Sequence, residues 1–302
     1  MDLLEKYKQL NNSFTKKKLI FHVGQYCGFF SEYRYMIWAM LYCLEHKIRF
    51  VLYSKDANFG YDKGWTDYFL PFCEEETDDW HSKHNKAAAD WKKQFNPKII
   101  KYHLLHRNTY LSSDIWRYYT SNSFQQKQFD IPELGIKGDL WEACHVLVNV
   151  TWNYNAAVRH AINRLIAELK LPENYIGFHI RSGDKYVEVK LLPVSDYVEA
   201  VCPVSDLRDA FVSTDNYDKI REFNDGFQDW TVFTLCRKEE KGYFHSNFMK
   251  QSLDFRKKQF ETFFASIEIL HSAAVFVGTL SSGPGYFEYI RRPKGTTLSV
   301  DS

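Results

Sequence analysis

Two cations and two carboxylates stand close together in one segment of the chain. The segment follows a predicted strand over 175–180 and contains Arg181, Asp184, Lys185 and Glu188. An Arg side chain presents a planar fork of donors that matches phosphate oxygens, and a nearby carboxylate can take a proton from a hydroxyl group. Taken alone, this loop is equally compatible with a solvated turn held by local ion pairs.

Two further loops with polar residues follow predicted strands. Thr214 and Asp215 come after a strand over 210–213, and a run rich in Gly and Ser, 278–285, follows a strand over 274–277. Backbone N–H groups at the start of a helix bind phosphate well, although Asp215 would also make a good N-cap. Because the carboxyl ends of parallel strands meet at one edge of a sheet, we expect the three loops to lie together.

Apolar periodicity supplies the elements that would position these loops. Between residues 175 and 290, short apolar runs alternate four times with segments of helical spacing, which is the pattern of a doubly wound, Rossmann-like sheet. Earlier in the chain, strands are predicted over 18–23 and 48–53, on either side of a helix for which Ser31 is the expected N-cap. The other elements predicted in the later half are helices over 195–201, 217–223, 252–271 and 285–290 and a strand over 231–235.

The chain of 302 residues is long enough for two domains. We expect an N-terminal α/β domain over residues 1–152, a linking helix over 153–172 and a C-terminal Rossmann-like domain over 173–302. The linking helix is predicted from apolar spacing that stops at a Leu-Pro pair. Residues 54–139 show clear helical spacing only over 87–95, so their fold is not assigned in detail.

Composition narrows the class of protein. The 39 basic and 38 acidic residues nearly cancel, which argues against a dedicated nucleic-acid-binding protein. The longest apolar run, 36–44, is shorter than the roughly 20 residues that cross a bilayer, and the N-terminus lacks a signal-peptide core, so a cytoplasmic location is expected. The six scattered cysteines fit reduced thiols, although their even number leaves disulfides open.

Several common catalytic and binding motifs are missing from the sequence. No Gly-x-Gly-x-x-Gly follows the first C-terminal strand, and neither a Walker-type Gly-Lys-Ser/Thr nor a Gly-x-Ser-x-Gly occurs. These absences argue against dinucleotide dehydrogenases, P-loop ATPases and α/β-hydrolases. The pairs His81/His84 and His103/His106 have a spacing compatible with metal ligation, but no Cys or carboxylate completes a known zinc pattern, so no metal is expected.

Together, the three loops resemble the motifs of a known family. Residues 177–185 are similar to the His-x-Arg-x-x-Asp-Lys motif of the α-1,6-fucosyltransferases, including the nodulation fucosyltransferases, and of the wider superfamily with the protein O-fucosyltransferases. Residues 211–216 look like the second motif of that family, and residues 275–282 look like the third. Residues 24–32, before an aromatic-rich helix, are similar to its Gly-rich acceptor-side turn.

The resemblance implies an α/β enzyme of GT-B type, in which two Rossmann-like domains face each other across a cleft. It also implies transfer of L-fucose from GDP-fucose to a glycan hydroxyl, with inversion and without a metal or other cofactor. Arg181 would bind the β-phosphate and His179 would contact guanine through its backbone. The remaining residues expected at the donor site are Thr214, Asp215, Glu268, Ser281, Ser282, Gly24 and Gly28, while Asp184 and Lys185 would organise the catalytic loop.

This sequence departs from the family pattern at three positions. Ser182 stands where many members have a second Arg. Val189 stands at the position of the proposed base of the α-1,6 enzymes, so we expect Glu188, one place earlier, to act as the base, with Asp184 as the second candidate. Ser266 replaces the Asp that reads guanine, for which Glu268 is the candidate substitute.

Two other functions remain open at this point. The protein could use another nucleotide sugar, or it could be a nucleotide- or glycan-binding relative that has lost catalysis, because a fold does not fix a function. The expected partners are a nucleotide-sugar donor and a glycan or glycosylated small-molecule acceptor, with no nucleic acid and no transmembrane segment. Aromatic rings suit either core packing or stacking on an acceptor sugar, and the tryptophans concerned are Trp65, Trp80, Trp91, Trp116 and Trp141.

Overall fold

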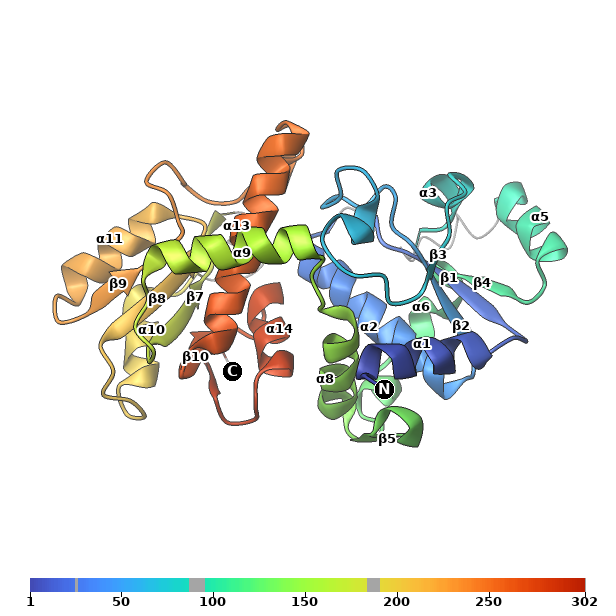
Figure 1. The fold of residues 1–302 in the computed structure, drawn as a ribbon, viewed down its shortest axis with the longest axis horizontal. Coiled ribbons are helices and arrows are strands. Elements are labelled where there is room, and N and C mark those ends of the chain that lie inside the picture. Colours follow the sequence, from blue (N-terminus) through green and yellow to red (C-terminus); the bar gives the residue numbers. More distant parts are fainter. Residues whose placement is uncertain (25–26, 87–95, 184–190, 302) are drawn as a thin grey trace. The chain divides into compact units, whose positions relative to one another are not determined.

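The computed structural model describes residues 1–24, 27–86, 96–183 and 191–301. Contacts within the chain divide it into two compact units, Met1–Asn155 and Ala156–Ser302. Each unit contains its own parallel β-sheet with helices packed against it (Figure 1). The predicted α/β class is therefore confirmed.

The sheet of the first unit has the strand order β3-β2-β1-β4, and all its strands are parallel. The central pair is β1 (Lys18–His22) and β2 (Arg49–Tyr53), and the outer strands are β3 (Glu74–Glu75) and β4 (Thr109–Leu111). Both central strands are buried from their second residue onward. The chain leaves β1 toward β2 and later returns to the opposite side of β1 as β4, so the topological switch point lies between β1 and β4.

The helices of the first unit enclose this sheet. Helix α2 packs on β1 and β2, α6 packs on β1 and β4, and α8 packs on α1 and α2. Their bounds are α1 (Leu3–Ser13), α2 (Phe29–Glu45), α6 (Ser112–Tyr119) and α8 (Leu140–Thr151). The shorter elements are η1 (Gly64–Asp67), α3 (Trp80–His84), α5 (Pro97–Leu105), α7 (Asn122–Gln125), η2 (Pro132–Leu134) and a hairpin of β5 (Phe129–Ile131) and β6 (Ile136–Gly138).

Helix α2 begins earlier than its sequence predicts. Its N-cap is Gly28 rather than Ser31, and the first two helical residues are Phe29 and Phe30. Both rings are buried, and both stack on or meet the edge of Trp152. The capping signal of Ser31 is overridden because the two aromatic rings gain more from burial in the core than a hydroxyl cap contributes.

The sheet of the second unit has the strand order β11-β10-β7-β8-β9, again entirely parallel. Its strands are β7 (Ile176–Ile180), β8 (Asp209–Thr214), β9 (Thr231–Phe233), β10 (Val275–Gly278) and β11 (Thr297–Ser299). The chain proceeds from β7 through β8 to β9 and then returns to the other side of β7 as β10. The switch point, where open α/β sheets bind ligands, therefore lies between β7 and β10.

Helices pack against both the strands and one another in the second unit. The helices are α9 (Ala156–Leu169), α10 (Val194–Val201), α11 (Tyr217–Gly226), α12 (His245–Phe248), α13 (Leu253–Ser272) and α14 (Gly283–Arg291). Helix α13 packs on β7 and β8, while α9, in the region expected to link the domains, runs against α13 within this unit (Figure 1). One apolar core surrounds Phe178, whose ring meets the edges of Phe223 and Trp230.

Candidate functional site

Arg181 follows the last residue of β7 and forms an ion pair with Asp215, which follows β8. Strand pairing places them together, because Ile180 lies opposite Thr214 in the register of the two strands. The two side chains are only 22% and 17% exposed, so water screens the pair less than it would on an open surface. The guanidinium also lies over the ring of Tyr243, 5.3 Å from its centre.

Asp215 organises the loops of this edge instead of capping the next helix. Its carboxylate accepts hydrogen bonds from the backbone N–H of Ser182 at 2.9 Å and of Tyr243 at 3.0 Å. The N-cap of α11 is Asn216, whose side chain accepts from the N–H of Asp218. Asp215 therefore joins three segments and fixes the direction of the Arg181 guanidinium.

The third of these segments, residues 240–243, was not predicted to belong to the site. Gly242 donates from its N–H to the carbonyl of Asp215 at 2.7 Å. Gly183 and Gly242 both have positive φ, and a Cβ on either residue would overlap the other segment. The Gly at position 242 before an aromatic residue is the only sequence signal that could have pointed to this close approach.

His179 lies inside β7 and is buried. Burial, together with the positive charge of Arg181, lowers the pKa of this imidazole from 6.5 to about 3, so the ring is neutral at physiological pH. Its Nδ1 atom has no hydrogen-bond partner among the described residues, and the hydroxyl of Ser182 is likewise buried without one. Buried polar atoms without partners are uncommon, and a bound ligand is one way in which they are satisfied.

The loop after β10 has its polar groups engaged within the protein. Ser282 is the N-cap of α14: its hydroxyl accepts from the N–H of Gly285 at 3.1 Å and donates to the carbonyl of Thr279 at 2.8 Å. The N–H groups of Leu280 and Ser281 donate to the carboxylate of Asp301 at 2.8 and 3.0 Å. This loop thus already binds a carboxylate with the kind of donors predicted to bind phosphate.

Glu268 lies near the end of α13 and accepts two hydrogen bonds from Arg291, at 2.9 and 2.7 Å. Helix α13 leads into the start of β10, whereas the loops of Arg181 and Ser282 follow the ends of strands. The Glu268 carboxylate is therefore at the amino edge of the sheet, in a bidentate ion pair. Its reading of guanine stays a prediction, and nearby Ser266 donates to the backbone carbonyl of Thr262.

The remaining predicted residues are placed as follows. Asp184, Lys185 and Glu188 lie outside the described residues. Thr214 ends β8, and its hydroxyl accepts from the N–H of Asn216. Gly24 and Gly28 belong to the first unit, where Gly24 follows β1 and Gly28 caps α2.

Metal ligands and thiols were also considered in the sequence. Within the described part of the chain, no three His, Cys, Asp or Glu side chains are arranged to hold a metal ion. His81 instead approaches the side chain of Asn85, and His103 lies 3.5 Å from Asp114. All six cysteines are free thiols. No helix in the described ranges is long and apolar enough to cross a membrane.

Comparison with solved structures shows which proteins share this fold. A NodZ α-1,6-fucosyltransferase soaked with GDP-fucose is 13% identical, with 92% of this chain and 94% of that chain covered and a TM-score of 0.58. NodZ from Bradyrhizobium is also 13% identical, with 95% of this chain and 96% of that chain covered and a TM-score of 0.57. A variant of Arabidopsis thaliana FUT1 in complex with GDP is 10% identical, with 99% of this chain and 79% of that chain covered and a TM-score of 0.54.

The sequence itself matches no protein-family model and no curated protein. The likeness therefore concerns the fold, which extends over almost the whole chain despite identities of 13% or less. The resemblance to fucosyltransferases predicted from the three strand-end loops is confirmed at this level.

Proposed function

We propose that the protein is an inverting glycosyltransferase that transfers L-fucose from GDP-fucose to a hydroxyl group of a glycan or glycosylated small molecule. The observation that carries the proposal is the guanidinium of Arg181, held by Asp215 at the end of β7 in a fold shared with fucosyltransferases. This position borders the switch point between β7 and β10, where a nucleotide diphosphate would meet it.

The chemistry follows from where charge develops. As the bond between the anomeric carbon and the β-phosphate oxygen breaks, negative charge grows on the leaving GDP. A cation that is already fixed in place stabilises this charge more in the transition state than in the ground state, which is how it accelerates the reaction. Because Arg181 supplies that charge, the proposal includes no metal.

Inversion requires the acceptor oxygen to attack the anomeric carbon from the face opposite the leaving diphosphate. A base must take the acceptor proton as the new C–O bond forms. Glu188 is our first candidate and Asp184 the second, with Lys185 supporting the loop. These three assignments come from the sequence.

Arg181→Ala tests the proposal directly. We expect GDP release from GDP-fucose in the presence of acceptors to fall by about 10²- to 10³-fold, the usual cost of removing one preorganised donor to a developing oxyanion. Arg221→Ala is the matched control, because Arg221 is an exposed cation of α11 in the same unit. Near-normal turnover by the Arg181 variant would show that this loop is not the donor site.

A melting-temperature panel with GDP, UDP, ADP and CDP identifies the donor. A ligand that binds only the native state raises the melting temperature, so we expect the largest rise with GDP. The largest rise with another nucleotide would indicate a different sugar donor. GDP binding without release of GDP from GDP-fucose, across a panel of acceptors, would favour a binding protein that has lost catalysis.

The proposal also includes a cytoplasmic location. The supporting observation is that all six cysteines are free thiols, which is the usual state in a reducing compartment.

A further inference from the structure

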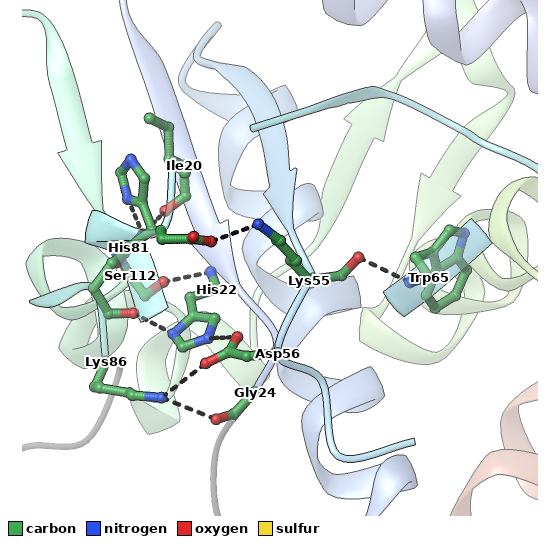
Figure 2. A network of polar contacts seen from close by, with 12 residues as sticks. Ile20, His22, Gly24, Lys55, Asp56, Trp65, His81, Lys86 and Ser112 are labelled. Carbon is green, nitrogen blue, oxygen red and sulfur yellow. Dashed lines mark hydrogen bonds and ion pairs between the residues drawn. The ribbon is translucent and has the colours of Figure 1, made fainter. Parts of the chain in front are cut away.

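A second polar network lies at the carboxyl edge of the sheet in the first unit (Figure 2). His22 is the last residue of β1, and its Nε2 lies 2.6 Å from a carboxylate oxygen of Asp56, which follows β2. Its Nδ1 lies 2.7 Å from the backbone carbonyl of Asn85. The ammonium group of Lys86 approaches the other Asp56 oxygen at 3.4 Å and the carbonyl of Gly24 at 3.1 Å.

The geometry indicates where the protons of this network lie. A carbonyl oxygen only accepts hydrogen bonds, so Nδ1 of His22 carries a proton. A second proton must lie between Nε2 and the Asp56 oxygen, because two lone pairs would repel at 2.6 Å. Burial raises the pKa of Asp56, but its bonds to His22 and Lys86 outweigh this and lower the pKa below its usual value. One ring nitrogen of His22 is therefore bound to Asp56 and the other to the backbone of Asn85.

Buried contacts fix the positions of His22 and Asn85 in the network. The His22 side chain is fully covered, and its ring meets the edge of Tyr53 at 5.2 Å. Asn85 is itself fixed, because its side chain donates to the carbonyl of Ile20 and accepts from the N–H of Ser112. Gly24 passes so close that a Cβ would overlap Nε2 of His22 and the Asp56 carboxylate.

Two groups of the network face solvent. The side chain of Asp56 is 33% exposed and that of Lys86 is 27% exposed. Each Asp56 oxygen has one described partner, and a carboxylate offers about four acceptor sites, so acceptor capacity remains. Lys86 has two described acceptors for its three N–H donors. A fixed acceptor and a donor therefore stand side by side.

The position of this donor and acceptor is one where parallel sheets bind ligands. His22 ends β1, Asp56 follows β2 and Ser112 follows β4. The hydroxyl of Ser112 accepts a hydrogen bond from the N–H of His22. The network thus borders the switch point between β1 and β4. The carboxylate can only accept hydrogen bonds and the ammonium can only donate them, and the two groups, 3.4 Å apart, supply each other's counter-charge. The pair therefore matches a neutral ligand with neighbouring hydroxyl groups, each of which can both donate and accept.

We propose that Asp56 and Lys86 bind two neighbouring hydroxyl groups of a neutral carbohydrate. The carboxylate accepts a hydrogen bond from one hydroxyl group, and the ammonium group donates one to the other. His22 is a positioning residue, because its buried ring holds the Asp56 carboxylate by a hydrogen bond. The assignment of this carbohydrate as the sugar acceptor rests on the proposed function, whereas its binding does not.

The experiment measures binding of the full chain to an immobilised panel of neutral mono- to tetrasaccharides built from hexoses and N-acetylhexosamines. We expect the protein to bind at least one member, Asp56→Asn to weaken that binding at least tenfold, and Lys86→Gln to weaken it several-fold. Asp79→Asn is the matched control, because Asp79 also pairs with a lysine but is largely exposed. The rise in melting temperature with GDP should be unchanged in all three variants.

Each outcome decides the inference. If no member of the panel binds while GDP still raises the melting temperature, the inference is wrong and the proposed function stands. Equal binding by Asp56→Asn or Lys86→Gln and by the unaltered protein overturns the inference as well. If carbohydrate binds as expected but GDP does not, the inference holds and the proposed function fails.

A spectroscopic measurement tests the positioning role of His22. In the ¹H–¹⁵N NMR spectrum, we expect a ring N–H signal of His22 shifted downfield by its hydrogen bond to Asp56, and we expect Asp56→Asn to move this signal upfield. His22→Gln should weaken carbohydrate binding, while the GDP effect stays intact. A ring N–H signal of His22 that is the same in the unaltered protein and in Asp56→Asn would contradict the positioning role assigned to His22.

Discussion

At the residue scale, Asp215 is the group on which the geometry of Arg181 depends. Its carboxylate accepts two backbone N–H groups and pairs with the guanidinium. Asp215→Asn removes the charge and places an amide NH₂ group against the N–H donors of Ser182, Tyr243 and Arg181. We therefore expect the free energy of unfolding to fall by about 2 kcal/mol and GDP to bind more weakly. Chemical denaturation and GDP titration measure the two effects.

Asp218→Asn serves as the control for this prediction. Asp218 lies three residues later and also pairs with cations, Arg221 and Lys241, but it is exposed. We expect no measurable change in either quantity for this variant. Equal effects of the two substitutions would mean that Asp215 contributes only a surface charge.

His179 gives the protein a predictable response to acid. The unfolded chain binds a proton at this residue near pH 6.5, while the folded protein does so only near pH 3. Between these values the unfolded state holds more protons, so stability falls as pH falls, by up to about 1.4 kcal/mol per pH unit. The contribution is absent above pH 6.5 and reaches about 2 kcal/mol at pH 5.

His179→Gln should remove this part of the pH dependence. Urea denaturation at pH 7 and pH 5 would then show a difference in stability smaller by about 2 kcal/mol than in the unaltered protein. His160→Gln, at an exposed position of α9, should leave the difference unchanged. An unchanged difference in the His179 variant would show that the imidazole is not held neutral.

The sequence predicted Arg181 better than its partner. A cation directly after a buried strand is a local signal, whereas the pairing with Asp215 joins residues 34 positions apart and depends on the register of β7 and β8. From the sequence, Asp215 is expected either to cap a helix or to bind the donor, and its pairing with Arg181 is not predicted. His22 and Asp56 were missed, although the strand-end rule used for the second unit would have indicated both at the ends of β1 and β2.

At the element scale, the alternation of strands and helices in the second unit was predicted to within a few residues. The central strand β7 is a short apolar run that is buried throughout, and its neighbours β8 and β10 are buried over three residues each, so their apolar runs are clear in the sequence. The prediction missed β11, whose three residues are only partly buried and carry little apolar signal. It also missed α1, whose buried residues are few, and the short strands β3 to β6 of the first unit.

The loop between β10 and α14 leads to a prediction about Asp301. Its carboxylate occupies the N–H groups of Leu280 and Ser281, and Ser299 also donates to it at 2.7 Å. If phosphate binds at this loop, as the sequence predicts for Ser281 and Ser282, the carboxylate competes with it. We expect Asp301→Asn to lower stability by about 1 kcal/mol and to raise the affinity for GDP.

Calorimetric titration of GDP into both proteins measures this effect. Ser299→Ala removes one of the donors to Asp301 and leaves its charge, so it should change stability without raising the GDP affinity. A weaker GDP affinity in Asp301→Asn would instead show that the carboxylate shapes the loop for the nucleotide.

At the scale of the whole molecule, aromatic residues make up 17% of the chain and serve largely for packing. Trp65 is buried and stacks on Phe69, with ring centres 4.4 Å apart. Three others stack on or tilt against neighbouring rings: Trp80 on Tyr102, Trp116 on Tyr35 and Trp141 on His145. Trp91 lies outside the described residues. These ring contacts favour packing over stacking on an acceptor sugar for the four tryptophans.

Each unit contains a parallel sheet with polar side chains at its switch point. Two different ligands should therefore protect different sets of backbone amides. In hydrogen exchange, we expect GDP to protect amides of 177–183, 213–216 and 278–282, and to leave 18–22 and 53–57 unchanged. A neutral oligosaccharide from the panel should do the reverse. At a ligand concentration of about 100 Kd, amides that exchange only from the unliganded state slow by about 100-fold. Protection by GDP of the first set alone supports two sites, and protection of the edge of the first unit without that of the second would reverse the assignment of donor and acceptor.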